Sequence, residues 1–173
     1  GMGVFGGRAF RRILQADLAP HLIQRAHDRQ RLGQRHGRAF ALTAPHVPLD
    51  PHPDHAGHSA AAEYGDVVEE IDANVGRLFT KLKELTLDDD TLVIVTSDNG
   101  PWLSYGDHAG SAGPLREGKG TCWEGGTRVT GIMKWPAKIP AGTTTDTMMM
   151  TIDILPTIAH VIEAKLPAHT IDG

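Results

Sequence analysis

An aspartate, an asparagine and a glycine, Asp98, Asn99 and Gly100, follow an apolar run that ends at Thr96. The run is typical of a β-strand, and open α/β sheets place their ligand crevices at the carboxyl ends of strands. A carboxylate and an amide offer the hard oxygen ligands that Ca²⁺ and Mg²⁺ prefer, and a glycine lets the chain turn away sharply. The same tripeptide is also typical of a simple turn. The tripeptide therefore suggests a cation site, and the neighbouring residues must decide between that site and a simple turn.

A lysine between two glycines is the second candidate. Gly113, Gly118 and Lys119 have the G-x-x-x-x-G-K spacing of a phosphate-binding loop, but Gly120 stands where that loop needs Ser or Thr. Neither a preceding strand nor a following helix is apparent, so we set nucleotide binding aside. The segment fits a surface turn as well as an anion site, in which glycines allow an ammonium group to approach closely.

Histidines form a third group, and His46 lies among prolines that enforce an extended loop. His52, His55 and His58 recur every third residue, which suggests Zn²⁺. Prolines and a glycine between them preclude the helix that would align them, and no fourth ligand is evident. We therefore interpret these three as surface histidines.

The elements that position these residues are predicted from periodicity. Apolar side chains recur at helical spacing over 59–87, which predicts a long amphipathic helix. Residues 88–90, three aspartates, are interpreted as a solvated turn that ends it. The β-branched run at 91–96 predicts a strand covered on both faces, and residues 41–44 a short buried strand. A helix, a turn and a buried strand indicate an α/β fold.

Residues 97–126 form a long glycine-rich loop, which we interpret as functional because long loops inside compact domains are usually functional or disordered. Within it, Asp107 and His108 are interpreted as surface residues rather than substrate contacts. Three further elements are predicted: strands at 128–135 and 147–152, and a helix at 154–164.

The composition fits one soluble domain, since 173 residues with 40% hydrophobic and 22% charged content leave room for one core. No run approaches the roughly 18 apolar residues of a membrane span, and no export signal is visible. We therefore expect no membrane partner and leave the compartment open. A single cysteine, Cys122, rules out an internal disulfide framework.

Residues 1–40 differ from the rest in holding eight arginines, no lysine and two acidic residues. Clustered arginines can neutralise phosphates, but the missing lysines and interleaved aromatics argue against a nucleic-acid arm. We expect no nucleic-acid partner. We interpret 1–40 as an atypical basic leader, with a non-native or frameshifted origin as a hypothesis, and 41–173 as the domain proper.

Together these pieces resemble the type I sulfatases, the arylsulfatase family within the alkaline-phosphatase-like superfamily. The resemblance covers about residues 42–173 and is carried by Ala44–Pro48, Glu63-Tyr64, Thr96–Pro101, Gly118–Thr121, Trp123–Gly126, Trp135-Pro136 and Ile152–Thr157. It implies the mixed sheet flanked by helices of that superfamily. We expect an incomplete fold, truncated at both ends, with 41–173 as the C-terminal part of the catalytic domain only.

The resemblance also implies roles for four residues. Asp98 and Asn99 would bind the active-site cation, usually Ca²⁺ with Mg²⁺ as the alternative. Lys119 and His46 would contact the sulfate of a sulfuric ester as substrate-binding and catalytic residues. The metal and the ammonium would stabilise charge on the sulfuryl oxygens, and the histidine would donate to the leaving oxygen during hydrolysis. Relatives are often periplasmic or secreted.

The family's nucleophile motif is absent. Relatives form a formylglycine from Cys or Ser in C/S-x-P-x-R, whereas Ser111 is one residue too far from its proline and Cys122 has no proline in reach. We interpret Cys122 as a packing residue. The Asp-Asp pair that relatives carry on their first strand is missing too. We therefore expect weak metal binding and negligible activity from this chain alone.

Two alternatives to a sulfatase stay open. A phosphoesterase of the same superfamily would need a similar cation and lysine. A non-catalytic remnant would bury its apolar surface by self-association, and either way we expect a homo-oligomer.

Overall fold

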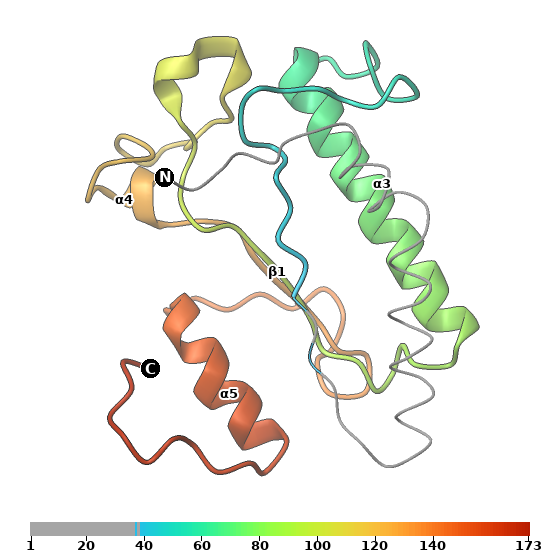
Figure 1. Cartoon of the computed structure of the whole chain (residues 1–173), viewed down its shortest axis with the longest axis vertical. Helices are drawn as coiled ribbons and strands as arrows, with labels where there is room; N and C mark the ends of the chain where they lie inside the picture. Colours follow the sequence, from blue (N-terminus) through green and yellow to red (C-terminus); the bar gives the residue numbers. More distant parts are fainter. Residues whose placement is uncertain (1–36, 38) are drawn as a thin grey trace, which may run out of the picture.

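The computed structural model describes residue 37 and residues 39–173, in which helices lie on either side of a short strand pair (Figure 1). The basic leader, apart from residues 37, 39 and 40, lies outside the described residues. In chain order the elements are α3 (Ala62–Glu84), β1 (Val93–Thr96), the 3₁₀ helix η1 (Leu103–His108), α4 (Glu124–Thr127), β2 (Gly131–Lys134), the 3₁₀ helix η2 (Thr151–Asp153) and α5 (Ile154–Val161).

Helix α3 confirms the amphipathic prediction for 59–87. At its beginning, the Asp66 carboxylate accepts the backbone N–H groups of Ser59 and Gly57, both at 2.7 Å, and of His58 at 3.0 Å. These bonds, with that of Ser59 the largest cause, hold the pKa of Asp66 below its ordinary value, because they favour the charged form. At the other end, Lys81 and Lys83 lie in the last turn, where cations complement the helix dipole. The carboxylate therefore attaches the preceding loop to the helix.

The strands β1 and β2 pair antiparallel, with Val93 opposite Lys134 and Thr96 opposite Gly131. The C-terminal part of α3 packs on this pair: Leu82 and Leu87 are buried against Phe79 and Val93. Strand β1 therefore delivers the chain after Thr96 to one end of the strand pair, as the sequence predicted for the site.

Strand β1 differs from the prediction in its burial. Val93, Ile94 and Val95 are half-buried rather than covered on both faces. The reason is that, within the part of the chain that the structure describes, one strand pairs with β1 and α3 packs on it through Val93.

Two other sequence predictions are wrong. Residues 41–44 and 147–152 contain no strand, and residues 41–43 and 147–152 are exposed. A β-branched or apolar run becomes a strand only where a neighbour pairs with it, and none does so here among the described residues. The turn predicted at 88–90 is confirmed, with Asp89 and Asp90 exposed. Asp88 differs, because its side chain is 18% exposed and forms a close ion pair with Lys134 of β2, which links the turn after α3 to the sheet.

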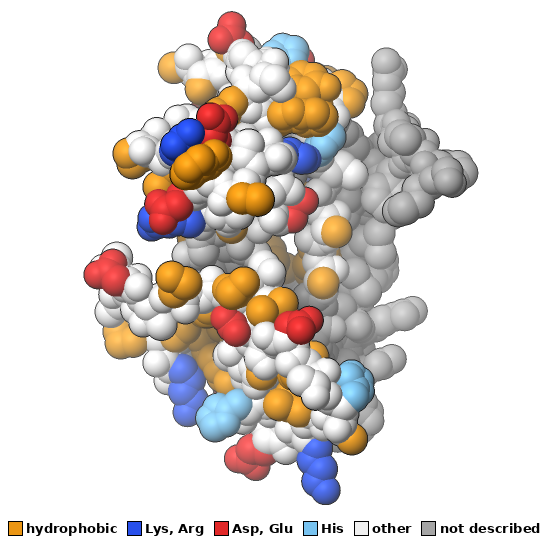
Figure 2. Space-filling model, turned by 90° about the vertical axis from the view of Figure 1, so that its left-hand side faces the viewer, with side chains coloured by type: hydrophobic (Ala, Val, Ile, Leu, Met, Phe, Trp, Pro, Cys, Tyr) orange, Lys and Arg blue, Asp and Glu red, His pale blue; other side chains and the backbone are white. Residues whose placement is uncertain are grey.

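The hydrophobic core is small. Among the described residues, the buried hydrophobic side chains are Leu49, Val67, Leu82, Leu87 and Ala159. Large apolar side chains remain exposed along the C-terminal part, including Met148, Met150, Ile152, Leu155 and Ile158. Figure 2 shows hydrophobic side chains (orange) over the lower part of one face, where α5 lies. No helix within 39–173 combines the length and the apolar character needed to cross a membrane.

Candidate functional site

The candidate site is built where the long loop crosses itself. The segment that leaves β1 lies against residues 116–126, and two backbone hydrogen bonds join the two. Gly100 N–H donates to the Gly126 carbonyl at 3.0 Å, and Lys119 N–H donates to the Pro101 carbonyl at 2.8 Å. Gly125 N–H donates to the Arg116 carbonyl at 2.8 Å within the second segment. This loop crossing brings the residues after β1 next to Lys119.

Glycines allow the crossing because no side chain would fit there. A Cβ on Gly100 would lie 1.8 Å from the Gly125 carbonyl oxygen, and a Cβ on Gly118 would lie 2.3 Å from that of Pro101. Real Cβ atoms essentially never approach other atoms more closely than 3.0 Å. The glycine pattern noticed in the sequence therefore serves close backbone packing as well as access to an anion.

Asp98 and Asn99 follow β1 directly, at the position that the sequence analysis gave them. Asp98 is exposed and Asn99 is half-buried. The Ser97 hydroxyl lies 3.5 Å from Asp98 Oδ1 and donates to the Asn99 backbone carbonyl at 3.1 Å. Because that contact with Asp98 is long, the carboxylate keeps acceptor capacity for a cation.

The donor set of Asp98 and Asn99 fits a hard divalent cation, but only in part. Ca²⁺ takes about six to eight oxygen ligands, and two side chains supply a fraction of these. Among the described residues, no group of three or more His, Cys, Asp or Glu side chains is placed to hold a metal ion. The two side chains would therefore supply only part of the ligand set of such a cation.

Lys119 and His46 each lie near the indole ring of Trp102. The Lys119 Nζ atom lies 5.2 Å from the ring centroid, within cation–π distance, and the imidazole centroid of His46 lies 5.9 Å from it. His46 Nδ1 lies 2.7 Å from the Val47 carbonyl oxygen, to which it must donate, so Nε2 is the ring nitrogen left for a ligand. The structure thus gathers the two predicted sulfate ligands around one ring.

Trp102 was missed by the sequence reasoning. The feature of the sequence that could have indicated a role for Trp102 is its position directly after Ser97–Pro101, near the beginning of the glycine-rich loop. Asp98 and Asn99 are joined to the Lys119 segment through the backbone bonds of Gly100 and Pro101.

The other polar candidates have structural partners. His108 Nε2 lies 3.4 Å from Glu63 Oε2, which ties η1 to α3. The backbone N–H of His52 donates to Glu70 at 2.8 Å and that of His58 donates to Asp66, so the three regularly spaced histidines lie in a loop anchored on α3.

Cys122 is exposed, so its interpretation as a packing residue is wrong. It lies just before α4, where buried Gly118, Gly125 and Gly126 occupy the inner positions of the crossing. Ser111 accepts the backbone N–H of Gly113 at 3.0 Å in an exposed turn.

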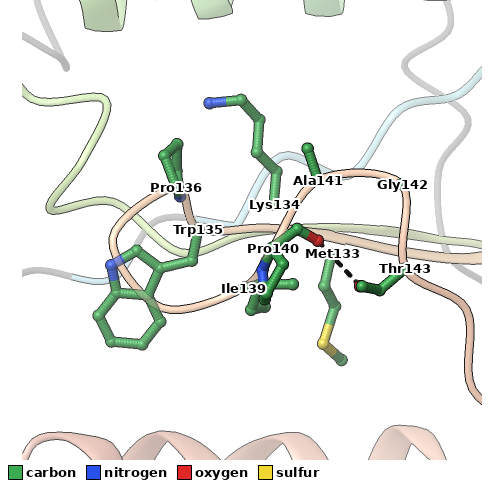
Figure 3. Close-up of a pocket in the computed structure, with 9 residues that line it drawn as sticks. All are labelled: Met133, Lys134, Trp135, Pro136, Ile139, Pro140, Ala141, Gly142 and Thr143. Carbon is green, nitrogen blue, oxygen red and sulfur yellow. Dashed lines mark hydrogen bonds between the residues drawn. The ribbon is translucent and has the colours of Figure 1, made fainter.

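A surface pocket lies apart from the crossing, on the turn after β2 (Figure 3). Its walls include Met133, Trp135, Ile139 and Pro140, and Thr143 Oγ1 donates to the Pro140 carbonyl at 2.9 Å. Lys134 also lines it but pairs with Asp88. The pocket contains none of the predicted site residues.

Comparison with known proteins places this geometry in a family. The family model described as Sulfatase matches residues 15–164, so the match begins inside the basic leader. The chain is 40% identical over 152 residues to arylsulfatase A of Bos taurus, covering 86% of this chain and 30% of the relative. It is 44% identical over 134 residues to steryl-sulfatase of Homo sapiens, covering 74% of this chain and 23% of the relative.

Solved structures agree with this assignment. Ps i-CgsB superposes with a TM-score of 0.76 at 30% identity, over 86% of this chain and 33% of that one. The PsFucS1 sulfatase from Pseudoalteromonas sp. superposes with a TM-score of 0.66 at 37% identity, over 72% of this chain and 24% of that one. The chain thus spans about a quarter to a third of the length of these proteins. Its fold is a part of the alkaline-phosphatase-like fold, and the chain belongs to the sulfatase family.

Proposed function

We propose that this chain supplies one part of the active site of a sulfuric ester hydrolase. Asp98 and Asn99 would hold a divalent cation, Ca²⁺ or alternatively Mg²⁺, and Lys119 and His46 would bind the sulfate group. The observation that carries the proposal is the approach of the Lys119 ammonium and the His46 imidazole to one indole ring, beside the loop that bears Asp98.

The chemistry of these groups suits a sulfate ester. An ammonium group beside the sulfuryl oxygens opposes their negative charge, and its attraction grows as charge develops on them. The bound cation would supply further positive charge to the same oxygens. Lys119 is half-buried, so its charge is screened less by water than that of an exposed lysine.

His46 would act on the leaving oxygen. Because Nδ1 donates to the Val47 carbonyl, only Nε2 can carry a proton toward a substrate, and it can give that proton only in the imidazolium form. As the bond between sulfur and the bridging oxygen breaks, the proton on Nε2 would pass to that oxygen, and the alcohol would leave neutral. We therefore assign His46 the role of general acid.

The nucleophile is the missing part. The printed sequence holds no C/S-x-P-x-R motif, so we propose that this chain binds sulfate esters without turning them over. Removing a covalent nucleophile abolishes most of the rate enhancement even when binding groups remain.

The proposal is tested by measuring the binding of phenyl sulfate in the presence of Ca²⁺ with ligand-observed NMR. Asp98→Asn and Lys119→Ala should each weaken binding by about tenfold or more, because each removes a charged contact. Lys138→Ala, which removes an exposed lysine outside the crossing, is the matched control and should bind as the parent does. Equal binding by Lys119→Ala and the parent would refute the assigned role.

Two comparisons separate the remaining alternatives. Phenyl phosphate should bind less tightly than phenyl sulfate, whereas the reverse order would favour a phosphoesterase. Release of phenol from phenyl sulfate by the chain would contradict the proposal that it lacks turnover.

We also propose that two or more copies of the chain associate, because large apolar side chains are exposed on η2, on α5 and on the segment before them. Met148 is 89% exposed and Leu155 is 53% exposed. Burial of such side chains stabilises an interface by about 25 cal/mol per Å² before the costs of association. Sedimentation across a range of concentrations should give a mass above that of one chain, and a monomer at every concentration would refute self-association.

A further inference from the structure

The indole of Trp102 lies against both proposed sulfate ligands and is 40% exposed. The Lys119 Nζ atom is 5.2 Å from its centroid and the His46 ring centroid is 5.9 Å away. A single exposed aromatic side chain is ordinary on a protein surface. An exposed indole in contact with the two groups that would hold the anion is a candidate part of the binding site.

Tyr105 holds this indole in place. Its ring packs on the edge of Trp102, with centroids 4.6 Å apart and planes at 63°, which is a favoured arrangement for two aromatic rings. The Tyr105 N–H donates to the Trp102 carbonyl at 3.0 Å, so the first turn of η1 fixes their spacing. Tyr105 is itself 46% exposed. We call this pair the aromatic shelf.

Rigid aromatic side chains supply contact area at a low entropy cost, and small-molecule sites combine such area with a few polar groups. A sulfate held by Lys119 and His46 would lie near the Trp102 indole, because the Lys119 Nζ atom is 5.2 Å and the His46 ring 5.9 Å from its centroid. The organic group of the ester would then be within reach of the indole. An aryl ring or the C–H face of a pyranose can stack on an indole, whereas a short acyclic chain offers little flat area.

We propose that Trp102 is a specificity-determining residue: the aromatic shelf stacks on the substrate, so the chain prefers esters in which a ring bears the sulfate. The inference rests on the proposed function, because it takes Lys119 and His46 as the sulfate ligands. It adds the residue that recognises the organic group of the ester.

A purely positioning role for Trp102 makes a different prediction. If the indole served only to orient Lys119 and His46, its removal would weaken the binding of every sulfate ester by the same factor. If the indole stacks on the substrate, its removal weakens the binding only of esters that carry a ring. The dependence on the organic group therefore distinguishes the two roles.

The experiment measures binding to the 173-residue chain with Ca²⁺, by ligand-observed NMR, for phenyl sulfate, methyl galactopyranoside 4-sulfate and ethyl sulfate. The parent should bind at least one ring ester several-fold more tightly than ethyl sulfate. Trp102→Ala should lose about tenfold in affinity for that ester, as expected for one stacked ring, and change within about twofold for ethyl sulfate. Trp102→Phe keeps an aromatic face and should retain most of the preference.

Trp123→Ala is the matched control. Trp123 is 49% exposed in the same loop, but the Arg116 guanidinium carbon lies 3.5 Å from its ring centroid and covers it. This variant should keep the ring preference. Circular dichroism of each variant checks that α3 is intact, and the phenylalanine variant provides the test if the alanine variant fails to fold.

Each result decides between the proposals. The inference is overturned if Trp102→Ala weakens the binding of all three esters equally. It is also overturned if the parent shows no ring preference but still binds ethyl sulfate through Lys119. Either result leaves the proposed function standing. A parent that binds no sulfate ester overturns both. A preference for phenyl sulfate identifies an aryl ring, and a preference for the galactoside identifies a sugar; both support the shelf.

Discussion

Replacing Gly100 by alanine should open the loop crossing. The new Cβ would lie 1.8 Å from the Gly125 carbonyl oxygen and 3.2 Å from the Cα of Gly126. Real Cβ contacts are essentially never shorter than 3.0 Å and are ordinary from 3.4 Å, so the Cβ and the carbonyl oxygen must move apart by about 1.2 to 1.6 Å. The obstacle is backbone rather than a flexible side chain. The separation would break the bond from Gly100 N–H to the Gly126 carbonyl, now 3.0 Å.

The cost follows from these two changes. Overpacking of a close contact costs about 1–3 kcal/mol, and one lost backbone hydrogen bond costs about 0.5–1.5 kcal/mol. Together they give about 2–4 kcal/mol, a large part of the roughly 5–15 kcal/mol that stabilises a small domain. If the crossing opens without global unfolding, the cost falls on the site. The affinity for phenyl sulfate should then drop by about 30-fold or more, the equivalent of about 2 kcal/mol.

The assay compares Gly100→Ala with Gly131→Ala in urea denaturation and in phenyl sulfate binding. Gly131 lies on β2, next to β1, and a Cβ there meets nothing within 4 Å. Its variant should keep both stability and affinity. If Gly100→Ala binds phenyl sulfate as the parent does and unfolds at the same urea concentration, the close approach of the two segments does not support the site.

Three further predictions concern α3. Gly76→Ala should raise the free energy of unfolding by about 0.5–1 kcal/mol, since a Cβ there meets nothing within 4 Å and alanine favours a helix interior; a lower urea midpoint would contradict this. Asp66→Asn should destabilise the chain at pH 7, because three backbone N–H groups hold the pKa of Asp66 below 3.8. That stabilisation is present above the unfolded pKa and is lost as pH falls through the folded pKa. The difference in the free energy of unfolding between parent and variant should therefore become smaller below about pH 4. A difference that stays constant between pH 7 and pH 3 would disprove this. Glu63→Gln removes the ion pair with His108, whose side chains are 44% and 53% exposed, and should change the free energy of unfolding by less than about 1 kcal/mol; a larger loss in urea denaturation would show that the pair does more than tether η1.

The sequence predicted the elements whose cause is local. The long helix was readable because apolar side chains recur every three or four residues and one face packs on Val93. Strand β1 was readable from its β-branched run, and the place of Asp98 followed from it. Both predictions depend on short-range patterns, which a sequence displays directly.

The parts that failed depend on distant neighbours. Residues 147–150 have a strand-like composition but find no pairing strand among the described residues. Asp88 looked like a solvated residue of its turn because its partner, Lys134, lies 46 residues away. Likewise, no local pattern indicates that Gly100 must meet Gly125, or that His46 and Lys119 must meet at Trp102.

The stability of the chain and the geometry of its site therefore depend on different contacts. Buried Leu82 and Leu87 hold α3 to β1, at the end of the strand opposite to Asp98. The position of Lys119 depends instead on the backbone bond to Pro101 and on glycines without side chains. A core substitution can thus lower the stability of the chain while the folded molecules keep the arrangement of the site. One methyl group at the crossing, in contrast, disturbs the site first. Because exposed loops open more easily than core contacts, a bound sulfate or cation would gain part of its affinity from a crossing that is already closed before binding.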